Sequence, residues 1–472
     1  MADAGWIAIM EDFLDKSNRT AQRGALIVTT LASFIDPFMG SSVNVALPTI
    51  GQEFAMSAVM LGWVSTAFLL AAATFSIPFG RLGDIYGRKR IYMIGVVVFT
   101  IASFFLAIST SSTMLIFLRV LQGFGASMAF ATRLAILISV FPANQRGRVL
   151  GINVAAVYLG LSTGPFIGGL ITQYLGWRFL FWLYLPVGAM MLTLIFFMLK
   201  GDWVDEKRHK FDIIGSIILA ASLVSTMYGF SKLPELYAAG LVGAGIFGIV
   251  GFVNYELRIE QPVVDINLFR KNTVFAFSNL AALINYAATF AVSFIMSLYL
   301  QKVRGYSPQI TGLIMVSQPI VQAMFSPLAG RLSDKMQPRT VSSVGMGMAL
   351  VGLILLLFIS ASMPLYYIIG CFVFLGFGFA LFSSPNTNAI LSSVERGHYG
   401  VAGAMVGTMR QVGMMFSMGI MMMILALHLG QAQIGAENIG AFVSSARTGF
   451  IVFAVLCFGG IFASLARGKM KR

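Results

Sequence analysis

Fourteen long apolar runs, separated by short polar segments, dominate the sequence. A helix that crosses a bilayer needs about 20 mostly apolar residues, and the runs are close to that length or longer. Backbone groups in lipid must be hydrogen-bonded internally, and no alternating pattern typical of a β-barrel is present, so each run is predicted to be a helix. The predicted spans are 24–46, 58–79, 91–109, 113–141, 149–171, 179–199, 212–230, 237–254, 274–300, 308–329, 341–361, 365–390, 399–427 and 448–466. We therefore expect an all-α, polytopic membrane protein.

The composition agrees with this fold class and excludes several others. Of the 472 residues, 58% are hydrophobic and 11% are charged, whereas soluble domains are about half apolar and a quarter charged. The net charge of +14 does not indicate nucleic-acid binding, because the charges lie in short clusters between apolar runs. Cys371 and Cys457 lie inside apolar runs and are interpreted as packing residues. No Ser/His/Asp set, metal cluster or phosphate loop is found, so we expect no enzyme activity, no metal and no cofactor.

The placement of Lys and Arg predicts the orientation in the membrane. With a cytoplasmic N-terminus, 24 of the 32 basic residues fall on inward segments and 5, including Arg447, on outward loops. The other three lie inside spans. We therefore expect a plasma-membrane protein with both termini in the cytoplasm. The N-terminal tail lacks the features of a signal peptide and is expected to be an amphipathic helix on the membrane or a solvated segment.

An internal repeat divides the chain. The sequence GRLGD at 80–84 recurs as GRLSD at 330–334, each time at the end of the second span of a six-span block. Two related halves around a central cavity are typical of transporters. The predicted division is a tail at 1–23, a six-helix bundle at 24–200, an inserted two-helix segment with connectors at 201–272, a second six-helix bundle at 273–466 and a tail at 467–472.

Several segments contain unusual combinations of glycine, proline and charge. The loop 80–90 reads GRLGDIYGRKR, the fourth span carries Arg119 with Gln122, and the fifth span contains GLSTGPFIGG at 160–169. The segment 254–269 contains NYELR followed by PVVDINLF. In these features the chain resembles the major facilitator superfamily, in its fourteen-span drug:proton antiporter branch. The resemblance implies a major facilitator fold with fourteen transmembrane helices arranged as six, two and six.

The resemblance also implies roles for two of these segments. The loop at 80–90 and its repeat would form a conformational latch between the halves, although a charged topology anchor is a simpler interpretation. The residues assigned to the latch are Gly80, Arg81, Gly83, Asp84, Gly87, Arg88, Gly330, Arg331 and Asp334. The residues assigned to an antiporter motif, which marks exporters, are Gly160, Gly164, Pro165, Gly168 and Gly169. An ordinary glycine-rich helix contact is the alternative for that motif.

Asp36 is the acidic residue that lies deep within a span. An acid at the bilayer centre costs about 2.5–3.5 kcal/mol on insertion scales, so such a residue is normally paired, hydrated or functional. The family pattern places an acid five residues before the Asn of the string VNVALP, which corresponds to Met39 in this chain. Asp36 lies about 4.5 Å earlier along the helix and about 60° around it, so it can face the same cavity.

Arg133 in the fourth span is the expected partner of Asp36. Counted from the cytoplasmic ends of their spans, Asp36 lies about 18 Å deep and Arg133 about 13 Å deep. We hypothesise that a proton or substrate breaks this pair, with a purely structural buried pair as the alternative. Arg119 is assigned to the same proton-coupling group, because the resemblance associates it with proton transfer or buried hydrogen bonding.

Further polar or adaptable side chains within the spans are assigned to a substrate cavity. They are Met39, Asn44, Asn285, Tyr286, Gln318, Gln322, Asn386, Asn388 and Arg410. Each can alternatively serve only to bond neighbouring helices. The expected function is proton-coupled efflux of hydrophobic or cationic small molecules by alternating access. The alternatives are transport of a small metabolite or organic anion, which Arg133 and Arg410 favour, and a non-transporting sensor or channel. The expected partners are a small-molecule substrate, a proton and the lipid bilayer, without nucleic acid.

Overall fold

The computed structural model describes residues 2–142, 145–199, 201–202, 211–260, 262–395, 399–430 and 432–468, and within these its regular structure is entirely helical. The first six helices are α1 (Ala2–Glu53), α2 (Ala58–Tyr86), α3 (Arg88–Ala107), α4 (Ser112–Val140), α5 (Arg146–Tyr174) and α6 (Arg178–Met198). The inserted pair is α7 (Ile213–Lys232) and α8 (Leu236–Glu256). The remaining elements are α9 (Ile266–Lys271), α10 (Thr273–Leu298), the π-helical η1 (Tyr299–Val303), α11 (Pro308–Met315), α12 (Ser317–Lys335), α13 (Pro338–Leu356), α14 (Leu365–Ser392), α15 (Tyr399–Leu429), the 3-10 helix η3 (Ala436–Asn438) and α16 (Ile439–Ala466).

Fourteen helical stretches in the described residues are long and apolar enough to cross a membrane, as the sequence predicted. Several helices begin where the local sequence provides an N-cap. The hydroxyls of Ser57 and Ser111 accept from the amides of Met60 and Met114, and Asn272 accepts from the amide of Phe275. Such caps satisfy amides that have no partner in the first helical turn.

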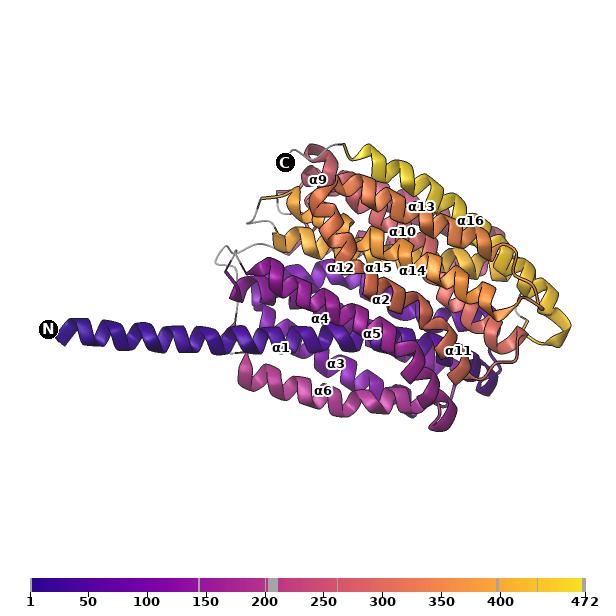
Figure 1. Cartoon of the computed structure of the whole chain (residues 1–472), viewed down its shortest axis with the longest axis horizontal. Helices are drawn as coiled ribbons and strands as arrows, with labels where there is room; N and C mark the ends of the chain where they lie inside the picture. The colour runs from indigo at the N-terminus through magenta and orange to yellow at the C-terminus, as the bar shows by residue number, and fades with distance from the viewer. Residues whose placement is uncertain are drawn as a thin grey trace.

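Three spans illustrate where the helices depart from the sequence prediction. The first span is continuous with a helix that begins at Ala2 and projects beyond the bundle (Figure 1). The side chains of residues 1–20 lie outside the described part, so the expected character of the tail is not addressed. The last span begins earlier than predicted, so Arg447 lies within α16 rather than in an outer loop, and its guanidinium donates to the carbonyl of Ile359. The tenth span consists of two helices, α11 and α12, separated at Val316.

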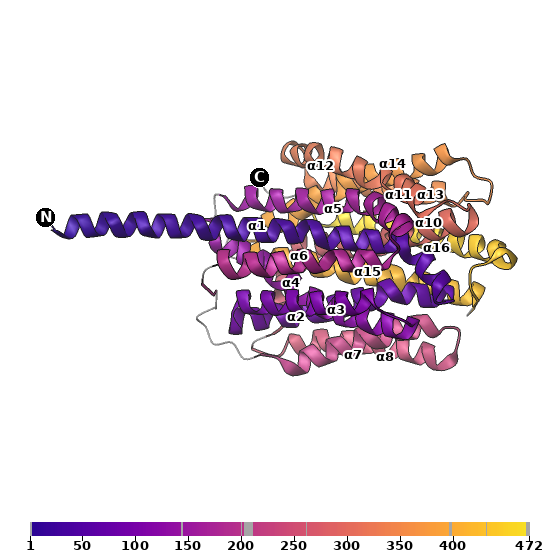
Figure 2. The ribbon, with the colours of Figure 1, turned by 90° about the horizontal axis from the view of Figure 1, so that it is seen from below.

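The internal repeat is visible in the helix packing. In the first half α1 packs on α5, α2 and α3 pack on α4, and α3 packs on α6. The second half repeats this pattern, with α10 on α15, α12 and α13 on α14, and α13 on α16. The halves meet through α2 with α15 and through α5 with α11 and α12. The inserted pair α7–α8 lies along the outside, where α7 contacts α2 and α15 (Figure 2).

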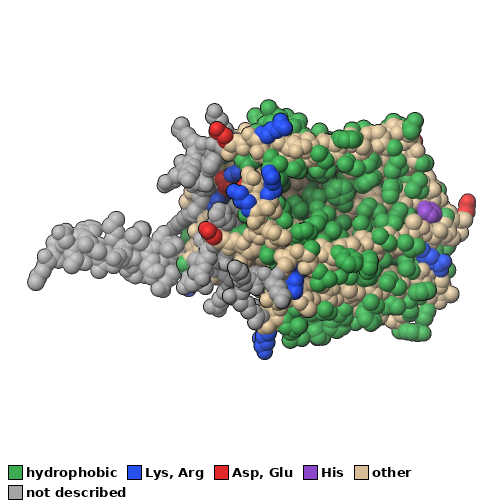
Figure 3. Space-filling view, turned by 90° about the horizontal axis from the view of Figure 1, so that it is seen from above, with side chains coloured by type: hydrophobic (Ala, Val, Ile, Leu, Met, Phe, Trp, Pro, Cys, Tyr) green, Lys and Arg blue, Asp and Glu red, His purple; other side chains and the backbone are tan. Residues whose placement is uncertain are grey.

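The surface matches a bilayer environment. On the face drawn in Figure 3, hydrophobic side chains cover the middle of the molecule and charged side chains gather toward its two ends. Large apolar side chains such as Phe117, Phe196 and Phe247 are more than 65% exposed. Both chain ends lie toward the same end of the bundle (Figure 1). Exposed apolar surface of this kind is stabilised by lipid rather than by water.

Candidate functional site

The predicted ion pair between α1 and α4 is present. Arg133 Nη1 lies 2.6 Å from Asp36 Oδ2, and the two side chains are only 15% and 14% exposed. Burying two charges costs several kcal/mol per ion, which their attraction offsets only when the geometry is good. The pair therefore holds α1 to α4 in its charged form, and a change in its protonation changes that attraction.

Local sequence explains how α1 presents Asp36. Pro37 follows directly and has no amide hydrogen, so it cannot donate to the carbonyl one turn earlier in the helix. The hydroxyl of Ser33, at that turn, donates to Asn153 Oδ1 of α5 at 2.8 Å. Ser41 Oγ donates to the carbonyl of Pro37 at 2.8 Å. The helix therefore lacks one backbone hydrogen bond next to Asp36, and the side-chain hydrogen bonds of Ser33 and Ser41 stabilise this part of α1.

Two buried phenols that the sequence prediction missed lie near the pair. Tyr92 on α3 is fully buried and interacts electrostatically with both Asp36 and Arg133, and its hydroxyl has no hydrogen-bond partner among the described residues. Tyr184 on α6 is 3% exposed and also interacts with the pair. Their distance in sequence from Asp36 gives no sign of this proximity.

Arg119 lies apart from this pair, although the two arginines share α4. Fourteen residues, or about 21 Å of helix, separate it from Arg133. Its Nε donates to the carbonyl of Val64 at 2.9 Å, Nη1 donates to Gln122 Oε1, and its guanidinium lies 4.5 Å from the centre of the Phe68 ring. This geometry gives Arg119 the buried hydrogen bonding that the resemblance implied and ties α4 to α2.

The glycines of the fifth span lie where α5 touches α1. A Cβ at Gly160 would lie 2.2 Å from the carbonyl oxygen of Phe34, and one at Gly164 would lie 1.9 Å from Ser41 Oγ. A Cβ at Gly168 would lie 2.5 Å from the Cβ of Ser42. Any side chain at these positions would separate the helices.

The same helix also packs tightly on the second half. A Cβ at Gly169 would lie 2.5 Å from the carbonyl oxygen of Pro308, and one at Gly312 of α11 would lie 2.1 Å from the carbonyl oxygen of Pro165. The glycine-rich segment is thus a close contact both within the first half and between the halves. The antiporter role assigned to it stays a prediction.

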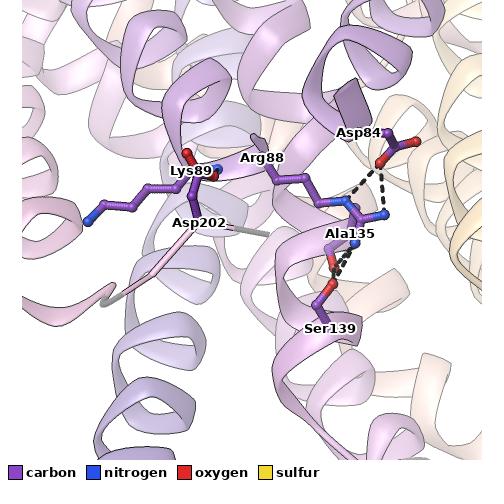
Figure 4. A network of polar contacts seen from close by, with 6 residues as sticks. All are labelled: Asp84, Arg88, Lys89, Ala135, Ser139 and Asp202. Carbon is purple, nitrogen blue, oxygen red and sulfur yellow. Dashed lines mark hydrogen bonds and ion pairs between the residues drawn. The ribbon is translucent and has the colours of Figure 1, made fainter. Parts of the chain in front are cut away.

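The loop between α2 and α3 forms a network within the first half (Figure 4). Arg88 Nη2 lies 2.8 Å from Asp84 Oδ1, and Arg88 Nη1 donates to Ser139 Oγ and to the carbonyl of Ala135 on α4. Gly83 packs on α4, because a Cβ there would lie 2.8 Å from Thr132 Cγ2. Gly80 only touches α4 at ordinary distance, 3.8 Å from the Cβ of Ala131.

Asp202, which the sequence prediction missed, caps the start of α3. Its Oδ1 accepts from the amide of Lys89 at 3.1 Å, and its Oδ2 lies 3.1 Å from Arg90 Nε. Gly87 has a φ of +109°, and a Cβ there would lie 2.3 Å from the Asp202 carboxylate. An acidic side chain at a helix N-terminus is stabilised by the unpaired amides and the helix dipole. Glycine at 87 makes room for this cap, which comes from the segment after α6.

The second copy of the motif has fewer contacts. Gly330 lies near Ser384, with a Cβ-to-Oγ distance of 3.2 Å. Arg331 is exposed and makes no hydrogen bond or ion pair with its side chain within the described residues, and the side chain of Asp334 lies outside them. From the first copy, Arg81 Nη2 reaches beyond the first half and donates to the carbonyl of Pro262 at 2.6 Å. A latch between the halves stays a prediction, since the described partners of Asp84 belong to the first half.

One of the predicted cavity residues lies at a contact between the halves. Asn44 on α1 accepts from Ser65 Oγ of α2 at 3.2 Å, and its Nδ2 lies 3.5 Å from Ser293 Oγ of α10. Its carbonyl accepts from Ser297 Oγ at 2.8 Å. Met39, on the same helix, is 5% exposed. Asn44 therefore belongs to a hydrogen-bonded contact between α1 and α10.

A second cluster joins α10 to α15. The guanidinium of Arg410 lies 6.0 Å from the centre of the Tyr286 ring, and that ring lies 6.3 Å from Phe379. Asn285 is 1% exposed, and its Nδ2 has no hydrogen-bond partner among the described residues. A cation, an aromatic ring and an unpaired amide donor are groups that orient an organic substrate.

The remaining predicted cavity residues separate into two pairs. Gln318 and Gln322 lie on α12, and neither side-chain amide has a polar partner within the described residues. Asn386 and Asn388 on α14 are instead occupied by neighbours. Asn386 Nδ2 donates to the carbonyl of Ser278, and Asn388 Nδ2 donates to Ser333 Oγ.

The partner of Asn386 is an arginine that the sequence prediction placed in the C-terminal tail. Arg467 is 1% exposed, and its Nη1 donates to Asn386 Oδ1 at 3.0 Å and to Ser278 Oγ at 3.2 Å. Burial lowers the pKa of Arg467 to about 10. Arg467 therefore links α16, α14 and α10 at the end of the bundle where the chain ends.

Two related six-helix groups with buried polar residues at their contacts define the architecture of a secondary transporter. A family model described as the Major Facilitator Superfamily matches residues 29–257 and 278–470, and the chain belongs to this family.

Curated relatives cover nearly the whole chain. The riboflavin transporter of Clostridioides difficile is 31% identical over 438 residues, covering 92% of this chain and 95% of its own. A multidrug resistance protein of Mycobacterium tuberculosis is 31% identical over 418 residues, covering 87% and 77%. The crystal structure of a bacterial homologue of the human lysosomal transporter Spinster, inward-facing and unoccupied, shares the fold with a TM-score of 0.63 at 17% identity, covering 96% and 97%.

Proposed function

We propose that this transporter couples inward proton movement to the export of hydrophobic or cationic small molecules. The observation that carries the proposal is the buried Asp36–Arg133 pair. A proton on Asp36 removes the charge that attracts Arg133, so the contact between α1 and α4 weakens in one protonation state and tightens in the other. A ligand shifts such a two-state equilibrium by its differential affinity for the states.

We place both chain ends in the cytoplasm and the source of protons on the outer side of the cell membrane. A proton then binds Asp36 from the outer side, substrate leaves outward, and the carrier reopens inward before the proton is released. The surplus of Lys and Arg on the segments assigned to the inner side supports this orientation. Close packing of α5 on α1 and on α11 supports a mechanism in which helix surfaces, rather than loops, separate the two sides.

Export in the manner of the drug:proton antiporter branch is supported by the glycine-rich segment of α5 and by the similarity to a multidrug resistance protein. A second candidate is transport of a planar metabolite or organic anion. The Arg410–Tyr286 arrangement favours it, because an aromatic ring beside a cation binds flat, electron-rich molecules. The similarity to a riboflavin transporter points to the same class of substrate.

The test uses the purified protein in proteoliposomes. With an imposed pH gradient, the wild type should accumulate a labelled lipophilic cation, and Asp36→Asn should exchange it without accumulating it. Glu437→Gln, which neutralises an exposed acid in η3, is the matched control and should behave as the wild type. Unchanged pH-driven accumulation by Asp36→Asn contradicts the coupling role. Displacement by riboflavin or carboxylates, and not by lipophilic cations, selects the second candidate.

A further inference from the structure

Two carboxyl groups face each other at the base of the inserted helix pair, away from the Asp36–Arg133 pair. Asp212 is the N-cap of α7, and Glu256, the last residue of α8, is 2% exposed. One oxygen of each carboxyl is occupied. Asp212 Oδ1 accepts from the amide of Gly215 at 3.0 Å and from Tyr255 Oη at 3.2 Å, and Glu256 Oε2 accepts from the amide of Val264 at 2.8 Å.

The other two oxygens, Asp212 Oδ2 and Glu256 Oε1, are buried and have no hydrogen-bond partner among the described residues. Both border the small space left by the missing side chain of Gly215. A Cβ there would lie 2.1 Å from Asp212 Oδ2 and 2.4 Å from Glu256 Oε1. Two ionised carboxylates in one buried space repel each other, and a buried acceptor without a donor costs about 1–3 kcal/mol.

Among the described residues, no Lys or Arg compensates the charge of these two carboxyl groups. Neither carboxyl forms an ion pair with a Lys or Arg in the part of the chain that the structure describes. On α8 the neighbouring titratable group is Tyr255, which already donates to Asp212. On the connector, Asp265 accepts from the amide of Asn267 at the start of α9.

The helices packed against this region contribute apolar side chains. Val264 of the connector belongs to a hydrophobic cluster with Met405 of α15 and Ile77 of α2. The cation that approaches the connector from α2 is Arg81, whose guanidinium is directed at the carbonyl of Pro262. A single proton placed between the two unpaired oxygens removes the repulsion and supplies the missing donor at once.

We propose that Asp212 and Glu256 share one proton between Asp212 Oδ2 and Glu256 Oε1, and so form a proton-binding site in the inserted helix pair. The proton lets Glu256 Oε2 keep its bond to Val264, which fixes the connector to α8. Arg81 holds the same connector from α2 through Pro262. Loss of the proton drives the two carboxylates apart and loosens the connector that leads from the inserted pair to α10.

Infrared spectroscopy of the purified, full-length protein tests for this proton without requiring transport. Ordinary carboxyl groups are ionised at about pH 6, so a carboxylic-acid C=O band that persists there reports a retained proton. The wild type should show this band, and Glu256→Gln and Asp212→Asn should each lose it. Glu235→Gln, at the opposite end of α8, and Asp36→Asn should both retain it. A wild type without the band, or a band that survives both site variants, overturns the proposal.

Thermal unfolding between about pH 6 and about pH 9 gives a second readout. The folded protein retains a proton that the unfolded chain releases, so raising the pH through the site's titration should lower the melting temperature of the wild type. In Glu256→Gln the side-chain amide donates a hydrogen bond to Asp212 at every pH. The melting temperature of this variant should therefore fall less as the pH rises. An equal decrease in both proteins contradicts the proposal. If sodium ions stabilise the wild type but not Glu256→Gln, the site binds a metal cation instead of a proton, and the proposal is wrong.

Discussion

The two halves share a helix arrangement but place the arginines within their spans in different surroundings. In the first half, Asp36 on α1 pairs with Arg133. The two copies of the repeated motif are 250 residues apart, and at that offset Tyr286 on α10 corresponds to Asp36. Tyr286 offers an aromatic ring, not a carboxylate, to Arg410. The same framework therefore carries a group that can change its charge in one half and a neutral aromatic contact in the other.

The largest effect should follow from breaking the first-half pair. Arg133→Gln leaves Asp36 buried without its cation, and removing one partner of a buried pair typically costs 3–5 kcal/mol. We expect a strong loss of thermal stability in detergent, and recovery of most of it in the double variant Asp36→Asn, Arg133→Gln. In the second half, Arg410→Gln should cost far less. If the Arg133→Gln variant is as stable as the wild type, the ion pair in the first half does not contribute more stability than the Arg410 contact in the second half.

The α5 glycines should give the next largest effect. Gly164→Ala places a Cβ 1.9 Å from Ser41 Oγ, and overpacking of this kind typically costs about 1–3 kcal/mol. Gly407→Ala on α15 is the matched control, because a Cβ there meets nothing within 4 Å. We expect the first variant to lose stability and transport and the second to retain both, as measured by melting temperature and efflux rate. Equal losses of melting temperature and efflux rate in the two variants would contradict a packing role for Gly164.

The two copies of the repeated motif should respond differently to the same change. Arg88→Gln removes contacts to Asp84, Ser139 and Ala135, whereas Arg331→Gln removes an exposed side chain. Because the Arg88 side chain is 24% exposed, the cost in stability should be about 1 kcal/mol or less. The transport rate should fall for Arg88→Gln and stay near wild type for Arg331→Gln. A larger loss for Arg331→Gln would reverse the comparison.

The smallest effect is expected at the aromatic contact. Tyr286→Leu removes the ring beside Arg410, and a cation–π contact is worth about 0.5–1 kcal/mol at an exposed site. The KM for an aromatic substrate should rise about two- to fivefold, and the dependence of transport on the pH gradient should stay unchanged. A variant that loses its pH dependence would place the coupling chemistry in the second half as well.

The sequence predicted the features that depend on periodic or local signals. Span length and hydropathy predicted the fourteen helices, and the position of Asp36 relative to Arg133 in their spans predicted the ion pair. Features built from distant segments were missed. Asp202 caps α3 from beyond α6, Arg467 reaches Asn386 across the second half, and Tyr92 approaches the pair from α3. Each of these depends on the rotation and register of packed helices, which composition and spacing do not determine.

The most direct test of the account is to count protons per transported substrate molecule. Proteoliposomes loaded with a pH-sensitive dye should show proton movement opposite to a substrate gradient in the wild type. In Asp36→Asn, substrate should still exchange across the membrane while the coupled proton signal disappears. Proton movement that continues in step with substrate in Asp36→Asn would contradict the assignment of coupling to the Asp36–Arg133 pair.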